Sequence, residues 1–287
     1  MRLLITGAAG QLGTDVRLAA EAAGDDVLAV ARGDLDVTDR GAVLGTITSW
    51  RPDAVVNAAA WTAVDACETD PDRAFAANAL AVRWVAEACD RVGAHLVHVS
   101  TDYVFDGSLD RPYHEWDAPA PASVYGASKR AGELEALALG TGAAVVRTSW
   151  VCGEHGSNMV RTIIRVADGG DDTPGRMAFV DDQRGHPTFT ADLAPLLRRL
   201  VVDRRSGVVH ATNQGAVSWF EFAQAVVAGI GRPPEIVRPI TTAELDPPRP
   251  APRPANSVLD NRVLRSAGIP LLRDFRQPLA ELIAALR

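Results

Sequence analysis

The stretch Arg2-Leu3-Leu4-Ile5-Thr6-Gly7-Ala8-Ala9-Gly10-Gln11-Leu12-Gly13 decides the fold of this chain. It opens on a short apolar run that fits a buried strand, and glycines then recur at every third residue. Glycine lets the backbone turn sharply and come close to a ligand. A helix that starts at such a turn offers free N–H groups and a partial positive charge. The stretch therefore predicts a strand, a turn and a helix that together hold an anionic group.

The same alternation of strand and helix continues through the first half of the chain. Short apolar runs are separated by longer, alanine-rich amphipathic segments. This pattern predicts an α/β fold, with a doubly wound parallel sheet of the Rossmann type and helices on both faces. We expect strands at residues 2–6, 26–31, 54–57, 95–100 and 143–147, and helices at residues 11–23, 39–49, 71–92 and 125–139.

The pattern loosens after about residue 151. Residues 247–254, Pro-Pro-Arg-Pro-Ala-Pro-Arg-Pro, predict an extended surface segment because proline has no N–H to donate. Helices expected at residues 219–230 and 275–286 would build a smaller C-terminal lobe. We predict a dinucleotide-binding domain over residues 1–150, to which the chain returns at about 176–210, and a mainly substrate-binding lobe over residues 151–287.

Composition excludes several classes of protein. The 287 residues carry a formal net charge of -7, which does not favour nucleic-acid binding. No apolar run approaches the ~20 residues of a membrane span, and the first residues do not resemble a secretory signal. Cys67, Cys89 and Cys152 are too few and too widely spaced for a disulfide framework, which predicts reduced packing cysteines and a cytoplasmic protein.

The glycine turn is the first candidate site. Gly7, Gly10 and Gly13 follow the spacing G-x-x-G-x-x-G, which differs from the usual G-x-G-x-x-G of dinucleotide-binding proteins. A plain glycine-rich turn is the alternative. The strand before it and the helix after it favour a pyrophosphate site.

The residues after the second strand bear on the choice of cofactor. An acidic residue there binds the ribose of NAD, whereas an arginine accepts the 2′-phosphate of NADP. The predicted strand ends at Ala31-Arg32 with no carboxylate at its tip, so Arg32 favours NADPH, although NADH remains possible and Arg32 can equally be a solvated loop residue. Asp36 is expected beside the adenine. The small residues of segment 58–62 predict a close passage along the cofactor.

Tyr125 and Lys129 form the second candidate site. Four residues apart on one helix, their side chains share a face, and Lys129 is the only lysine in the chain. A nearby ammonium and the surroundings of a bound nicotinamide ring are expected to lower the pKa of the phenol toward neutral pH. Thr101 ends a predicted strand, at the edge where ligands bind in such sheets. We expect Tyr125 to protonate a substrate oxygen, Lys129 to support it and bind the cofactor ribose, and Thr101 to orient a carbonyl that receives a hydride. The alternative is a helix-start tyrosine beside a solvated lysine.

Taken together, these motifs resemble the dTDP-4-dehydrorhamnose reductase family of extended short-chain dehydrogenases/reductases. The resemblance covers nearly the whole chain, and the strings Ser-Thr-Asp-Tyr-Val-Phe and Arg-Thr-Ser-Trp-Val are specific to this branch. It rests on residues 7–13, 57–65, 100–107, 125–129, 147–151, 182–188 and 253–257.

The resemblance implies NAD(P)H-dependent reduction of the 4-keto group of dTDP-4-dehydro-L-rhamnose to dTDP-L-rhamnose. It assigns catalysis to Thr101, Tyr125 and Lys129, and substrate binding to Thr101, Asp102 and Trp150, for which a core aromatic role is the alternative. With the glycine turn and the strand ends, the expected cofactor-binding residues are Gly7, Gly10, Gln11, Leu12, Gly13, Arg32, Asp36, Val37, Ala60, Trp61, Thr62, Val99, Tyr125 and Lys129.

Some features depart from the family. Trp61 and Cys152 stand where histidine and tyrosine are frequent, and either can alter the pocket. Some members dimerise around a magnesium ion; Asp15 aligns with one ligand, but Ala191 and Ala285 fall at the others. We therefore predict no such metal, and leave open whether the protein is a monomer or a homodimer.

Three other functions stay open. The chain can reduce another dTDP-linked keto or aldehyde sugar of a natural-product pathway, or serve as a non-catalytic, NADP-binding regulatory subunit, as one relative of the family does. A nucleotide-sugar epimerase shares the fold and the tyrosine-lysine pair, but normally needs a second acid/base or a recycled cofactor.

Overall fold

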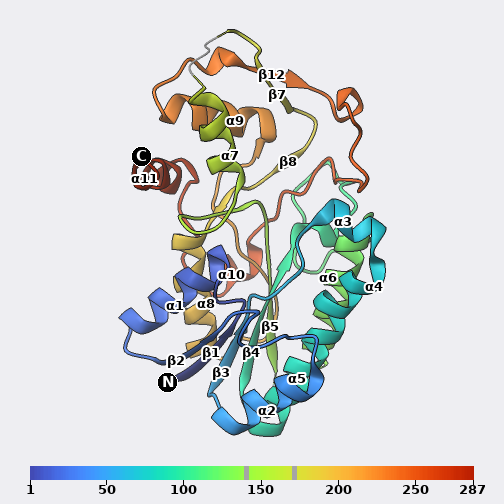
Figure 1. The fold of residues 1–287 in the computed structure, drawn as a ribbon, viewed down its shortest axis with the longest axis vertical. Helices are drawn as coiled ribbons and strands as arrows, with labels where there is room; N and C mark the ends of the chain where they lie inside the picture. The colour runs from blue at the N-terminus through green and yellow to red at the C-terminus, as the bar shows by residue number, and fades with distance from the viewer. Residues whose placement is uncertain (139–141, 170–172) are drawn as a thin grey trace.

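The computed structural model describes residues 1–138, 142–169 and 173–287. A parallel sheet with helices on both faces forms the larger part, and a smaller lobe lies beyond the end of the sheet that is opposite the N-terminus (Figure 1). The expected end of one helix at residue 139 lies outside the described residues.

Among the described residues, six parallel strands form the main sheet, in the order β10-β5-β4-β3-β1-β2. From β1 the chain runs outward to β2 on one side, and from β3 onward it builds the other side. Ligands of doubly wound sheets bind where the order reverses, here between the carboxyl ends of β1 and β3. The predicted fold class is confirmed. The strands are β1 (Arg2–Thr6), β2 (Asp26–Val30), β3 (Ala54–Asn57), β4 (His95–Thr101), β5 (Ala143–Thr148) and β10 (Gly207–His210).

Both faces of the sheet are buried under helices, which explains the apolar character of its strands. Leu3 and Ile5 pack with α1 and α8, whereas Leu4 points to the other face and packs with α2 and α5. The helices on the two faces are α1 (Gln11–Ala22), α8 (Thr190–Val202) and α10 (Arg262–Ser266), and α2 (Arg40–Trp50), α5 (Ala81–Val92) and α6 (Val124–Leu137).

The helix expected over residues 71–92 is interrupted. It consists of α4 (Pro71–Phe75), a π-helical turn η1 (Ala76–Leu80) and α5, and a short helix α3 (Val64–Thr69) precedes it. Pro71 starts α4 because proline fits the first turn of a helix, and Asp70 caps that turn by accepting a hydrogen bond from the Arg73 N–H. A π turn inserted in a helix often lies at a functional site.

The smaller lobe has a core of its own, centred on Ile163, Phe222 and Phe275. The elements α8 and β10 return to the main sheet, whereas β7 pairs with β12 in the lobe. The division into two domains at residue 150 stays a prediction. The remaining elements are η2 (Asp102–Val104), β6 (Val151–Cys152), α7 (Met159–Ala167), β7 (Met177–Val180), β8 (Arg184–Gly185), β9 (Thr188–Phe189), β11 (Val217–Ser218), α9 (Trp219–Gly229), η3 (Pro234–Ile236), β12 (Val237–Ile240), η4 (Thr242–Glu244) and α11 (Arg276–Ala285).

The proline-rich segment 247–254 forms neither helix nor strand, as predicted. Its surface position is confirmed for residues 247–250, which are exposed, whereas Ala251 and Pro254 are buried. Cys67, Cys89 and Cys152 are buried free thiols, and burial raises the pKa of Cys89 to about 12. Within the described ranges, no helix has both the length and the apolar character needed to cross a membrane.

Candidate active site

The predicted site residues meet at the carboxyl edge of the sheet. They line two adjoining hollows of about 540 Å³ each, which share Gly7, Gly10, Ala58 and Ala60 and so form one cleft. One hollow contains the residues predicted to be catalytic and is called the catalytic hollow; it is lined by Gln11, Leu12, Gly13, Thr62, Val99, Thr101, Asp102, Tyr125, Lys129 and Trp150. The other contains the residue predicted to lie beside the adenine and is called the adenine-side hollow; it is lined by Arg32, Asp36, Val37 and Trp61.

The glycine turn is packed too tightly for side chains. Gly7 has a φ of +69°, and a Cβ there would lie 2.7 Å from the Ala59 nitrogen. A Cβ on Gly13 would lie 2.3 Å from the Gly7 carbonyl oxygen. These glycines let β1, the start of α1 and the segment after β3 come together, which leaves bare backbone facing the cleft.

The N-terminus of α1 fits an anionic group. Gly10 is the N-cap residue and has no side chain to occupy the free N–H groups, and the first turn carries no acidic residue. The end of a helix dipole therefore faces the cleft without a neutralising carboxylate. The residues present suit the pyrophosphate of a dinucleotide.

The adenine-side hollow contains Arg32 and Asp36 as predicted, but the tip of the second strand differs from the prediction. Asp36 accepts hydrogen bonds from the Thr38 N–H (3.0 Å) and hydroxyl (2.7 Å), so that the Thr38 contacts lower the pKa of its carboxyl. The expectation of no carboxylate at the tip of the second strand is wrong, because Asp34 folds back and accepts the Ala31 N–H at 2.9 Å. Asp34 does not line the hollow, whereas Arg32 does.

Trp61 is held by residues that sequence reasoning did not select. The Arg73 guanidinium lies 4.4 Å from the Trp61 ring centre, a cation–π contact. The buried Asn78, in the π turn η1, accepts from the Trp61 N–H at 2.8 Å and donates to the Trp61 carbonyl at 3.0 Å and to the Ser128 hydroxyl at 3.1 Å. Asn78 thereby ties the Trp61 segment to the helix that carries Tyr125.

That helix, α6, presents Tyr125 and Lys129 to the same cleft, as their spacing predicted. Ser123 caps it by accepting the Gly126 N–H at 3.1 Å. The Lys129 Nζ donates to the Val99 carbonyl on β4 at 2.7 Å, which anchors the helix to the sheet. Tyr125 is 8% exposed and Lys129 2% exposed, so neither is a solvated surface residue.

The expected lowering of the Tyr125 pKa is wrong for this structure. Burial raises the pKa of the phenol above its ordinary value, because the phenolate loses its hydration, and the Thr101 hydroxyl only partly opposes this. The phenol is therefore protonated at neutral pH, the state that a proton donor needs. Burial also lowers the pKa of Lys129 to about 8, and the carboxylate of Glu133 counteracts part of that change.

Thr101 and Asp102 form a buried pair at the end of β4. The Thr101 hydroxyl accepts the Tyr103 N–H at 3.2 Å and donates to Asp102 Oδ1 at 3.0 Å. Burial raises the pKa of Asp102 to about 6, although the hydroxyls of Ser257 and Thr101 act against that rise. Asp102 lines the cleft, and its carboxyl lies next to the Thr101 hydroxyl.

An ion-pair network fixes α6 against the sheet. Glu133 accepts hydrogen bonds from Arg147 Nε (2.7 Å), from the Ser100 hydroxyl (2.7 Å) and from Arg130 Nη1 (2.8 Å). Glu133 and Arg147 are fully buried. Burial by itself would raise the pKa of the Glu133 carboxyl, but these donors hold it below its ordinary value. The network joins the ends of β4 and β5 to the helix one turn beyond Lys129.

Trp150 lies in the cleft and not only in the core. Its φ of +46° is unusual for a bulky residue, and its ring stacks on Trp219 with 3.7 Å between centroids. Gly185 makes room for the indole, because a Cβ there would lie 2.7 Å from the ring. Sequence reasoning missed Trp219, since it lies far along the chain and outside the motifs. Other missed lining residues are Ser100, Tyr103, Thr148, Ser149, Gly156 and Ser157.

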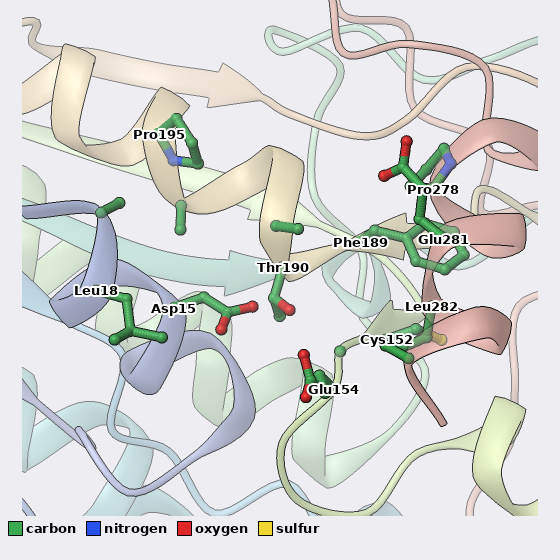
Figure 2. Close-up of a pocket in the computed structure, with 15 residues that line it drawn as sticks. Asp15, Leu18, Cys152, Glu154, Phe189, Thr190, Pro195, Pro278, Glu281 and Leu282 are labelled. Carbon is green, nitrogen blue, oxygen red and sulfur yellow. The ribbon is translucent and has the colours of Figure 1, made fainter. Parts of the chain in front are cut away.

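The three positions considered for a metal lie together. Asp15 on α1, Ala191 on α8 and Ala285 on α11 line one hollow, together with Glu154 and Glu281 (Figure 2). Alanine offers no ligand oxygen, and Glu281 is paired with Arg273. No group of three or more His, Cys, Asp or Glu side chains suited to a metal occurs in the part of the chain that the structure describes. The absence of a metal here stays a prediction.

The chain is similar to known proteins along its whole length. A family described as "RmlD substrate binding domain" matches residues 1–287. A dTDP-4-dehydrorhamnose reductase of Mycobacterium tuberculosis is 45% identical over 99% of this chain and 93% of its own length. A probable dTDP-4,6-dihydroxy-2-methyloxan-3-one 4-ketoreductase of Streptomyces antibioticus is 46% identical over 98% of this chain and 94% of its own. The crystal structure of dTDP-4-dehydrorhamnose reductase from Bacillus anthracis in complex with NADP has a TM-score of 0.92 at 35% identity, covering 99% of this chain and 98% of that one.

Proposed function

Because the chain belongs to the dTDP-4-dehydrorhamnose reductase family, we propose that it reduces the 4-keto group of dTDP-4-dehydro-L-rhamnose with NADPH, yielding dTDP-L-rhamnose. Two curated relatives of similar identity carry names of dTDP-sugar reductases, and a structural neighbour contains NADP. The single observation that supports the proposal most directly is that Thr101, Tyr125 and Lys129 line the same cleft as the glycine turn.

When bound, the nicotinamide cofactor supplies the hydride that adds to the substrate carbon. The backbone of Gly7, Gly10 and Gly13 would hold its pyrophosphate, and Arg32 would face its adenine ribose. Tyr125 gives its proton to the substrate oxygen, and the protonated state that burial favours suits that role. Thr101 directs the carbonyl toward the phenol, and the ammonium of Lys129 offsets the negative charge that then develops on Tyr125.

Asp102 and Trp150 would hold the sugar. Asp102 lines the cleft and would accept a hydroxyl of the hexulose through its carboxyl group, and the indole of Trp150 offers a flat apolar surface to its ring. The Trp150–Trp219 stack keeps that surface in one orientation.

A different dTDP-keto sugar is the second candidate substrate. The Streptomyces antibioticus relative, whose printed name gives another substrate, is as similar to this chain as the mycobacterial reductase. The proposed proton path would be the same for both substrates. We regard a regulatory role without turnover as less well supported, because Thr101, Tyr125 and Lys129 are all present in the cleft.

The test is a substrate screen with purified protein. We expect NADPH to be consumed fastest with dTDP-4-dehydro-L-rhamnose. The absorbance of the reduced cofactor measures the rate, and NMR identifies the product. Tyr125→Phe removes the proton donor and is expected to lower kcat by about 10²- to 10⁴-fold, with the Kd for NADPH unchanged.

Tyr113→Phe is the matched control. It removes a phenol of similar burial that donates to Asp106 and lies outside the cleft, so it should keep wild-type kcat. Undiminished turnover in Tyr125→Phe would exclude Tyr125 as the donor. Turnover of another dTDP-keto sugar alone would assign the second candidate substrate, and turnover of none would favour a binding subunit.

A further inference from the structure

A further hollow, which lies in the smaller lobe, adjoins the catalytic cleft. Tyr103 and Trp219 line both spaces, and the Tyr103 ring meets the Tyr125 ring edge-on at 5.6 Å between centroids. Met159 and Phe179 contribute apolar surface to this hollow of the smaller lobe. Its positive charge comes from Arg249 and Arg253 of the proline-rich segment 247–254, and none of its described lining residues is acidic.

Arg253 holds this segment in place. Its guanidinium forms a two-pronged ion pair with Asp65 of α3, with Nη1 at 2.5 Å from Oδ1 and Nη2 at 2.8 Å from Oδ2. The Ala251 N–H donates to the same carboxylate at 3.1 Å. The side chain of Arg253 is only 8% exposed. Its charge is thus balanced by Asp65, and its main effect is to fix the segment beside the cleft.

Arg249 is different because no carboxylate pairs with it directly, although its charge also acts on Asp65 at longer range. It is exposed and has no hydrogen-bond or ion-pair partner among the described residues. Burial raises the pKa of the Tyr103 phenol to about 12, and both guanidinium groups act against that rise, so that the Arg249 charge is felt at the cleft wall. Prolines on either side restrict the backbone of Arg249, which reduces the entropy lost when it binds a ligand.

The proposed substrate needs a cationic partner away from Tyr125. In a hexulose ring C1 lies opposite C4, so a sugar whose C4 carbonyl faces Tyr125 directs its C1 substituent away from the phenol. That substituent is the diphosphate of the nucleotide. The catalytic hollow contains one cation among its described lining residues, Lys129, which is engaged with the Val99 carbonyl.

We propose that Arg249 binds the diphosphate of the nucleotide sugar, with the sugar in the catalytic cleft and the anion in the adjoining hollow. The inference rests on the proposed function for the identity of the ligand. A guanidinium suits this task because its planar N–H groups match two phosphate oxygens at once. The ion pair between Arg253 and Asp65 keeps the segment that carries Arg249 at the cleft.

Calorimetric titration tests the proposal, with dTDP and thymidine as probes. We expect Arg249→Ala to weaken dTDP binding at least tenfold and to leave thymidine and NADPH binding unchanged. Arg249→Lys should recover part of the dTDP affinity. Arg238→Ala is the matched control, because Arg238 is an exposed arginine of the same lobe that does not line the hollow. In turnover, Arg249→Ala should raise KM for the dTDP-keto sugar at least tenfold and change kcat less than threefold.

The outcomes separate this inference from the proposed function. If Arg249→Ala binds dTDP within twofold of wild type, or if Arg238→Ala weakens it equally, the arginine site is overturned whatever the enzyme reduces. If dTDP binding depends on Arg249 but no dTDP-keto sugar is reduced, the anion site stands and the proposed reaction falls.

Discussion

Tyr125 and Lys129 are both buried, and burial shifts their pKa values in opposite directions. The phenol becomes a weaker acid and the ammonium a stronger one, because each loses water around its charged form. A protonated tyrosine beside a lysine that is still mostly charged at neutral pH is suited to donate a proton and then be stabilised by a cation. The activity of the site therefore depends on whether Lys129 keeps its proton.

We predict that activity falls above about pH 8. The folded-state pKa of Lys129 is lowered to about 8, so the ammonium is present below that pH and lost above it. Between pH 8 and 10, kcat/KM should drop about tenfold per pH unit. The pKa of Tyr125 is higher than that of Lys129, so the phenol does not cause this fall in kcat/KM. Rates across pH 6–10, with folding checked by circular dichroism, measure the effect, and a flat profile to pH 10 would contradict it.

Asp102 is predicted to reduce stability at the pH at which the protein works. Its pKa is raised from 3.8 to about 6 in the folded protein, so the unfolded chain ionises first and folding becomes less favourable as the pH rises through 6. Asp102→Asn should raise the free energy of unfolding by about 1–3 kcal/mol at pH 8 and by almost nothing at pH 4. Urea unfolding at both pH values measures this.

Asp106→Asn provides the opposite case. Hydrogen bonding from the Ser108 N–H lowers the pKa of Asp106, so this carboxylate stabilises the fold above its unfolded pKa and loses that effect as the pH falls. Removing it should lower stability at pH 8. If both variants shift stability in the same direction at pH 8, the raised pKa of Asp102 is not the cause.

The helix α6 owes its position to two glycines that admit neighbouring backbone. A Cβ on Gly126 would lie 2.1 Å from the Tyr103 carbonyl oxygen, and one on Gly132 would lie 2.1 Å from the Asn78 carbonyl oxygen. The first contact brings the helix against the turn η2, next to Thr101, and the second against the π turn η1. Glu133 then pairs with Arg147 on the sheet. These contacts, more than the helix itself, set where Tyr125 lies.

We predict that Gly126→Ala displaces α6. The added methyl group cannot be accommodated without moving the helix or η2, so we expect a loss of about 1–3 kcal/mol of stability and a fall in kcat of about tenfold or more. Gly45→Ala on α2 is the control, because nothing lies within 4 Å of its Cβ and alanine favours a helix. Thermal unfolding and steady-state kinetics compare the two, and equal behaviour would refute the steric argument.

On the scale of the complete chain, the hollow between α1, α8 and α11 bears on assembly. Asp15, Glu154 and Glu281 line it (Figure 2). Of the three positions at which metal-bridged relatives are expected to have acidic ligands, only Asp15 has a carboxylate, because the other two are Ala191 and Ala285. Glu281 is engaged with Arg273 across the same region. Among the described residues, Asp15 and Glu154 do not form part of any cluster of three side chains suited to a metal, so a divalent cation would lack the six or more oxygen ligands that it prefers unless water supplied most of them.

We therefore predict that chelation leaves the protein unchanged. Sedimentation velocity in EDTA and in magnesium should give the same oligomeric state, and activity should be equal in both buffers. A dimer that dissociates in EDTA and reforms with magnesium would show that a metal is bound despite Ala191 and Ala285.

Local sequence determined the parts of this protein that depend on neighbours along the chain. The glycine turn required a strand before it and a helix after it, and the four-residue spacing put Tyr125 and Lys129 on one face. The position of Thr101 at a strand end brought it to the ligand edge, because parallel strands end together. The fold class and the predicted set of residues that line the cleft follow from these short-range relations.

Contacts between distant segments decided the rest. The stacking of Trp219 on Trp150, the pairing of Arg253 with Asp65 and the closeness of Asn78 to Trp61 and Ser128 leave no periodic signal in the sequence. The direction of the Tyr125 pKa also reversed, since it depends on how completely the fold removes water from the phenol. Solvation and packing are properties of the assembled structure, and no motif of five residues contains them.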